Sequence, residues 1–125
     1  MILRNGSRTE PVVAAVCAVP ILTEALRTIL DGIAEVRTFP ARGGDTVGLL
    51  RSLAPDAIVV DTEDEAQAAA PFARDAELTL VHVLLRERKL RVLSGEEWQE
   101  FEDGASPEEI RNVLVGALYG SRRVA

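Results

Sequence analysis

Asp61 is the residue whose type and place in the sequence most clearly indicate chemistry. It directly follows the apolar run 57–60, which is rich in β-branched residues and predicts a strand buried on both faces of a parallel sheet. Open α/β sheets bind ligands beyond the carboxyl ends of such strands, so we expect Asp61 to border a ligand site. The first apolar run, 12–19, ends without an acid. Asp61 therefore lacks the second carboxylate that metal chemistry would need there.

Three further groups of side chains could take part in binding or catalysis, and each has two interpretations. The acids Asp61, Glu63 and Asp64 either bind a divalent cation or stabilise the positive end of the helix dipole at the start of the following helix. Cys17 is either a small buried apolar residue or a thiolate sensor at the rim of the pocket. His82 lies within an apolar strand and is expected to be a core histidine with a backbone partner, since no serine–aspartate pair completes a triad.

The order of predicted elements must bring these side chains together. Strands are predicted at 12–19, 35–39, 57–60, 78–85 and 98–101, and helices at 20–31, 45–53, 63–70 and 107–119. Pro71 is expected to interrupt the third helix. Residues 86–97 have no clear pattern, and a hairpin, a helix and a loop all remain open. The alternation of strand and helix predicts a parallel sheet.

Composition predicts a single globular domain. The chain has 125 residues, of which 47% are hydrophobic and 27% charged, and a domain of this length buries roughly two-thirds of its unfolded surface. The net charge of −6 argues against a broad basic surface for nucleic acid. A single cysteine, no apolar signal-peptide core and no run of ~20 apolar residues predict a cytoplasmic protein.

Three segments resemble the receiver domain of bacterial two-component response regulators. Residues 16–20 resemble the family's first strand and its acid-acid-X-Pro motif, with Pro20 in register. Residues 55–61 resemble the segment that ends in the phosphoacceptor aspartate, and 105–110 resemble the start of the last helix. The resemblance implies a receiver-like (flavodoxin-like) three-layer α/β sandwich with a five-stranded parallel sheet in the order 2-1-3-4-5. It also implies domain bounds of 11–120, with tails at 1–10 and 121–125.

Against that family, several site residues are replaced. Cys17 and Ala18 occupy the places of the two acids that hold Mg²⁺, and neither offers a hard oxygen ligand. Leu85 falls closest to the family's serine or threonine, and Glu102 falls nearest to its lysine. The metal and the lysine normally neutralise charge during phosphoryl transfer, and one such donor can be worth about 3–4 kcal/mol of barrier. We therefore expect Asp61 to be a vestigial phosphoacceptor.

The predicted function is a phosphorylation-independent pseudo-receiver that acts in bacterial signalling or transcriptional regulation through protein–protein contacts. We expect no enzyme activity, cofactor, metal, membrane contact or nucleic-acid contact. A homodimer is expected through 86–119, where a short or absent fourth helix would expose apolar surface. Trp98, Phe101 and Tyr119 are the interface candidates.

Three alternatives stay open. The first is a functional receiver phosphorylated on Asp61, and the second is a switch driven by a small ligand in the old pocket. The third is the receiver part of a DNA-binding regulator whose output domain is missing from this chain. A regulatory protein partner is compatible with each of them.

Overall fold

One mixed sheet organises the protein. The computed structural model describes residues 10–41, 45–102 and 105–119, and its six strands have the order β2-β1-β3-β4-β5-β6. The strands are β1 (Val12–Cys17), β2 (Glu35–Pro40), β3 (Ala57–Val60), β4 (Thr79–Leu84), β5 (Lys89–Ser94) and β6 (Glu97–Phe101). The helices are α2 (Pro20–Ile29), α3 (Thr46–Leu53), α4 (Glu63–Ala76) and α5 (Pro107–Tyr119).

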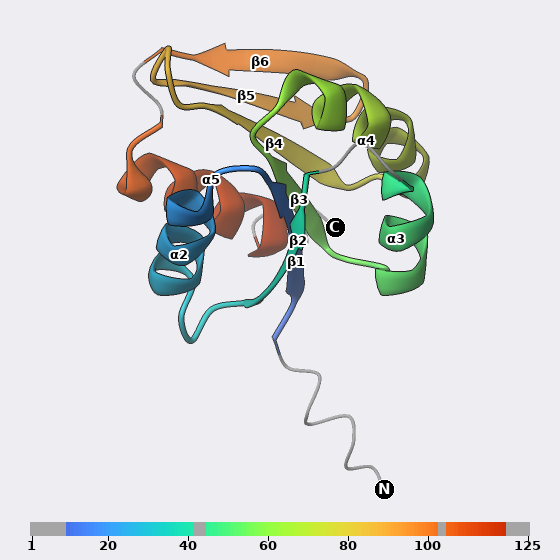
Figure 1. Ribbon diagram of the computed structural model, residues 1–125, viewed down its shortest axis with the longest axis horizontal. Coiled ribbons are helices and arrows are strands. Elements are labelled where there is room, and N and C mark those ends of the chain that lie inside the picture. The colour runs from blue at the N-terminus through green and yellow to red at the C-terminus, as the bar shows by residue number, and fades with distance from the viewer. Residues whose placement is uncertain (1–9, 42–44, 103–104, 120–125) are drawn as a thin grey trace, which may run out of the picture.

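Helices cover both faces of the sheet, which gives the three layers of an α/β sandwich. Helices α2 and α5 lie on one face, and α3 and α4 lie on the other (Figure 1). Alternate residues of the central strands supply the two cores: Ala15 and Val59 pack toward α2 and α5, whereas Val16 and Val60 pack toward α3 and α4. The predicted three-layer α/β class is confirmed.

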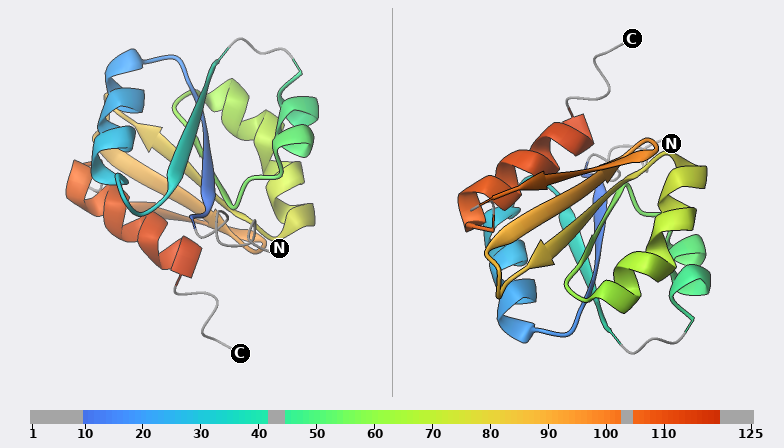
Figure 2. Two further views of the ribbon diagram at one scale, coloured as in Figure 1. Left: turned by 90° about the horizontal axis from the view of Figure 1, so that it is seen from below. Right: turned by 90° about the horizontal axis from the view of Figure 1, so that it is seen from above.

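The prediction of a five-stranded parallel sheet is wrong in strand number and in the direction of pairing beyond β4. Strands β2, β1, β3 and β4 are parallel, as expected, but β5 runs antiparallel to β4 and β6 runs antiparallel to β5. Only 85–88 separate β4 from β5, too few for the crossover of a dozen or more residues that a parallel connection needs. Figure 2 shows the resulting β5–β6 hairpin at the edge farthest from β2.

The hairpin also answers the open question about 86–97. Most of this segment forms β5 and the turns that flank it, with Arg88 at φ 58° and Gly95 at φ 72° in the left-handed region. Leu90 and Leu93 of β5 are fully buried. Strand β5 and its flanking turns thus take the place of a fourth helix between β4 and the last strand, and Leu90 and Leu93 join the two cores.

Helix α4 continues past Pro71, so the predicted interruption there is wrong. Proline inside a helix removes one hydrogen bond and costs about 3 kcal/mol or more. The helix nevertheless buries Ala66, Ala69, Ala70 and Ala73 against the sheet. Packing of this alanine face outweighs the local cost, because tertiary contacts provide most of the stability of helices in proteins.

Side-chain caps fix the helix starts as the sequence predicts. Asp45, Thr62 and Ser106 each accept a hydrogen bond from the backbone N–H three residues later, at 3.0–3.2 Å. Glu65 is 1% exposed, and its Oε1 accepts a 2.6 Å hydrogen bond from the Thr46 hydroxyl. This buried contact joins α3 to α4.

The predicted tails at 1–10 and 121–125 fall outside the described residues, apart from Glu10. The predicted domain bounds of 11–120 stay a prediction. Within the described ranges, none of the helices combines the length and the apolar character that crossing a membrane requires.

Candidate functional site

Strand β3 places Asp61 at the carboxyl edge of the sheet. All four residues of β3 are buried, and Asp61 follows them at the point where β1 turns into α2. Its Oδ1 accepts a hydrogen bond from the Ala18 N–H at 2.8 Å, and its Oδ2 accepts one from the Val19 N–H at 2.9 Å. Val19 is the N-cap of α2 and has no side-chain cap of its own. The carboxylate of Asp61 thus fastens the β1–α2 turn to β3.

This engagement limits what the carboxylate can do chemically. Charge-assisted hydrogen bonds to backbone N–H groups are among the stronger ones in proteins, and here each oxygen makes one. Each bond occupies one of the two lone-pair sites on its oxygen, and together the two bonds fix the orientation of the carboxylate toward the backbone. Asp61 is therefore held as a structural connector.

Cys17 and Ala18 lie beside Asp61, as the resemblance implied, but neither contributes a metal ligand. Cys17 is 6% exposed, and its thiol lies 3.8 Å from the Val59 carbonyl oxygen. Burial, and secondarily the Asp61 carboxylate, raises the pKa of the Cys17 thiol well above its ordinary value. The thiol stays protonated at neutral pH, which favours the apolar interpretation over a thiolate sensor. Ala18 contributes its backbone N–H.

Leu85 and Glu102 occupy very different places. Leu85 follows β4, is 40% exposed and lines the same pocket as Asp61. Glu102 follows β6 and lies 3.5 Å from Lys89 in an ion pair. In the observed strand order, β6 is three strand spacings, about 14 Å, from β3. The sequence puts Glu102 nearest to the family's lysine because 98–101 is predicted to be the strand next to β4, where β5 lies instead.

A pocket of about 400 Å³ opens next to Asp61 at the carboxyl ends of the parallel strands. Its lining combines the β1–α2 turn, the start of α4, the end of β4 and the β4–β5 turn. The lining residues are Val19, Asp61, Glu63, His82, Leu84, Leu85, Arg86 and Glu87. Sequence reasoning left His82 and Arg86 out of the site. Their position at and just after the predicted strand 78–85 was the signal that could have included them.

His82 lines this pocket, and one of its two ring nitrogens is buried without a hydrogen-bond partner among the described residues. The residue is 2% exposed, and its Nδ1 has no hydrogen-bond partner among the described residues, so the expected backbone partner is absent for that atom. Burial lowers the pKa of His82 below its ordinary value, and Arg91 lowers it further. The carboxylates of Glu63, Asp61 and Glu87 act in the opposite direction. The imidazole is therefore neutral at pH 7.

The acids after β3 do not converge on one point. The Glu63 carboxylate lies 3.6 Å from the Arg91 guanidinium and accepts a hydrogen bond from the Gln67 amide at 3.1 Å. Asp64 is exposed in the first turn of α4. Among the described residues, no three His, Cys, Asp or Glu side chains are arranged to hold a metal ion. The helix-dipole interpretation of these acids accounts for their positions.

The three interface candidates have distinct environments. Trp98 is half-buried on β6, packs against the α3–α4 core and has the Arg91 guanidinium 4.6 Å from its ring centre. Phe101 is 38% exposed near the end of β6. Tyr119 is 43% exposed, but its hydroxyl donates a 2.6 Å hydrogen bond to the Ile33 carbonyl. Tyr119 thereby ties α5 to the segment that precedes β2.

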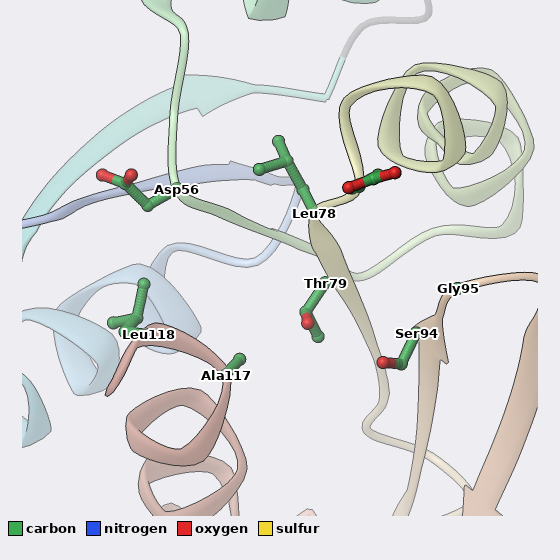
Figure 3. A pocket seen from close by; sticks show the side chains of 8 residues that line it. Asp56, Leu78, Thr79, Ser94, Gly95, Ala117 and Leu118 are labelled. Carbon is green, nitrogen blue, oxygen red and sulfur yellow. The ribbon is translucent and has the colours of Figure 1, made fainter. Parts of the chain in front are cut away.

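A second pocket, of about 220 Å³, lies at the opposite edge of the sheet, between α5 and the start of β4. Figure 3 shows Thr79 and Ser94 on neighbouring strands, with Ala117 and Leu118 of α5 opposite them. Asp56 also lines it and accepts a hydrogen bond from the Val12 N–H at 2.8 Å. Its lining includes no histidine, cysteine, lysine or arginine. The carboxyl edge is therefore the better candidate for a functional site.

Neither the protein-family models, nor the curated proteins, nor the solved structures include a match to this chain.

Proposed function

We propose that this chain is a receiver-like signalling domain of the bacterial cytoplasm that works without phosphorylation, as a protein-binding module. The observation that carries the proposal is the state of Asp61, whose two carboxylate oxygens each accept a backbone N–H of the β1–α2 turn. The acid at the phosphoacceptor position serves the fold. The resemblance in sequence and the order of the four parallel strands support the receiver-like assignment.

The electrostatics of the surrounding pocket support the same proposal. Glu63 and Glu87 line the pocket with Asp61 and would repel the anionic phosphoryl donor. Arg86 is the single arginine in that lining, and Glu102 pairs with Lys89 elsewhere. Phosphoryl transfer depends on cations that neutralise developing charge. Glu63 is paired with Arg91, so Arg86 is the guanidinium left beside Asp61 and Glu87, and one exposed guanidinium is a poor substitute for a metal and a lysine.

The β5–β6 hairpin is the surface that we propose for partner binding. Among the described residues, its outer strand, β6, pairs only with β5, so the backbone groups on its outer side are available to pair with an added strand. Glu97 and Glu100 lie on β6. A second copy added there would bring like charges together, so we favour a regulatory protein with a basic extended segment over the homodimer predicted from sequence.

One observation favours the alternative of a functional receiver that is phosphorylated on Asp61. Arg86 lines the pocket beside Asp61, and the geometry of its guanidinium matches that of a phosphoryl group. In that alternative, Asp61 would release the β1–α2 turn when it is phosphorylated.

One experiment separates the two functions. The protein is incubated with acetyl phosphate and Mg²⁺, and its intact mass is measured beside that of Asp61→Asn. We expect no phosphoryl adduct in either sample. A phosphoryl adduct on the natural protein that is absent from Asp61→Asn would replace the proposal with the phosphorylated receiver. Light scattering at micromolar concentrations then tests the state of association, and we expect a monomer.

A further inference from the structure

From the outer edge of β6, we infer a strand-addition site whose occupant is an antiparallel partner segment with basic and apolar residues at fixed positions. The inference rests on the protein-binding function proposed above, and it adds the chemistry of the partner and its register on the sheet. Three features of the β5–β6 hairpin support it: outward backbone groups, an excess of glutamates and an apolar groove beside Trp98.

The register of the hairpin determines which backbone groups of β6 point outward. Strand β6 lies at the rim of the sheet, with none of the described helices beyond it (Figure 1). A two-residue turn joins the paired residues Ser94 and Glu97, and residues that flank such a turn form a hydrogen-bonded pair. Hydrogen-bonded and non-hydrogen-bonded pairs alternate along an antiparallel ladder. Gln99 is therefore in a hydrogen-bonded pair with β5, whereas Trp98 and Glu100 direct their N–H and C=O groups outward.

Glutamates dominate the charge along this edge. Glu97 and Glu100 lie on β6, Glu102 follows it, and all three are exposed. Glu100 and Glu102 share one cation, Lys89, at 3.8 and 3.5 Å, and Glu97 forms no ion pair among the described residues. Opposite charges on facing residues of neighbouring strands stabilise their pairing. The occupant therefore carries lysine or arginine opposite Glu97 and Glu100.

A groove of about 240 Å³ lies between α4 and the hairpin, and it adds a preference for an aliphatic residue. Ala70 and Pro71 of α4 and Trp98 of β6 form its apolar part. Two charged residues of the lining, Glu63 and Arg91, form an ion pair with each other at 3.6 Å. Facing residues of neighbouring strands present their side chains to the same face of the sheet. The partner residue that bonds Trp98 thus places its side chain beside this groove.

The residues that the occupant faces determine its sequence pattern. We place the added strand antiparallel, because antiparallel ladders are slightly more stable per residue than parallel ones. In that direction the pattern is apolar, basic, polar, aliphatic and basic, facing in turn Phe101, Glu100, Gln99, Trp98 and Glu97. Phe101 is 38% exposed, and an apolar residue opposite it covers part of that ring.

The test titrates the full chain with the acetylated and amidated peptide Lys-Val-Lys-Thr-Leu-Lys-Lys, which has this pattern between two flanking lysines. Trp98 is the single tryptophan, so its fluorescence reports binding at the site, and we expect a saturable change. Two N-methylated peptides of equal charge then test the register. Methylation of the leucine nitrogen removes the N–H that bonds the Trp98 carbonyl and should weaken binding about tenfold. Methylation of the threonine nitrogen, whose N–H points away from β6, should leave the affinity unchanged.

Variants of the protein test the role of charge at about 0.15 M salt, where the Debye length is about 8 Å. Glu97→Lys should weaken binding of the unmethylated peptide about fivefold, because an attraction between exposed charges becomes a repulsion. Glu24→Lys makes the same charge change at an exposed position of α2 and should leave the affinity unchanged.

Two results would overturn the inference. The absence of a saturable fluorescence change would assign the glutamates of β6 to protection of a free sheet edge against association. Equal binding of the two N-methylated peptides would show attraction by charge without strand pairing. Neither result bears on the phosphoryl mass measurement, so failure of the strand register can be told apart from failure of the proposed function.

Discussion

The parallel and antiparallel parts of the sheet follow different rules. In the parallel part, β3 is buried along its whole length, and helices cover both of its faces. In the antiparallel part, β6 is exposed at four of its five positions and lies at the sheet edge. The parallel part holds Asp61 at its carboxyl edge, whereas β5 and β6 contribute none of the residues that line the pocket beside it. The comparison teaches that the buried parallel strands position the candidate site and that the hairpin completes the edge of the sheet.

The largest expected effect tests whether the two parts fold as one unit. Leu93 of β5 is fully buried and packs in the core that α3 and α4 cover. Leu93→Ala should lower the free energy of unfolding by about 2–5 kcal/mol, measured by urea denaturation as a single transition. Ile21→Ala, at a residue that is 75% exposed, is the control and should change it by less than about 0.5 kcal/mol. Two separate transitions would show that the hairpin unfolds independently.

The second effect concerns the connector in the parallel part. Asp61→Ala removes the acceptor of both the Ala18 and Val19 N–H groups and should destabilise the fold by about 2–3 kcal/mol, since hydrogen bonds to charged groups contribute 1.5–3 kcal/mol. Asp61→Asn keeps one acceptor oxygen and should cost less. Asp64→Ala, at an exposed acid in the first turn of α4, should cost only about 0.5 kcal/mol. Equal losses for Asp61→Ala and Asp64→Ala would contradict the connector role.

A third, smaller effect arises where the two parts meet. Burial lowers the pKa of His82 in the folded protein, so below pH ~6.5 the unfolded chain binds a proton that the folded chain resists. The stability contributed by this residue is complete above that pH and falls as the pH is lowered. In denaturant titrations between pH 8 and pH 5, His82→Phe should reduce the acid-induced loss. An identical pH profile for both proteins would remove His82 as its source.

The smallest effect is on reactivity rather than on stability. Burial raises the pKa of the Cys17 thiol, so iodoacetamide at pH 8 should modify the folded protein far more slowly than the urea-unfolded chain. Mass spectrometry follows the reaction. Rapid alkylation of the folded protein would restore the sensor interpretation of this cysteine.

The sequence predicts the parallel part well because its signals are local. The buried run 57–60, the cap at Thr62 and the Ser106–Pro107 helix start each act through neighbouring residues. Asp61 directly follows the run 57–60 in the sequence, so its position at the carboxyl end of that strand follows from the chain direction alone. Asp61 therefore lies at the sheet edge where its place in the sequence puts it, and the functional role of that edge stays a prediction.

The remaining features depend on contacts between distant residues. No local pattern indicates that β5 pairs antiparallel with β4, since that pairing is set by a short connection and by the burial of Leu90 and Leu93. The misplacement of Glu102 follows from this one strand. The continuation of α4 through Pro71 likewise depends on packing of its alanine face. The bonds from Asp61 to the β1–α2 turn span more than 40 residues of sequence.

Hydrogen exchange of the Ala18 and Val19 amides tests the central claim most directly. If the Asp61 carboxylate holds both N–H groups, these two amides are protected from exchange in the natural protein and lose that protection in Asp61→Ala, while the amides of β3 stay protected. Exchange of Ala18 and Val19 at the same fast rate in both proteins would show that the carboxylate is free, and the account of Asp61 as a structural connector would then be wrong.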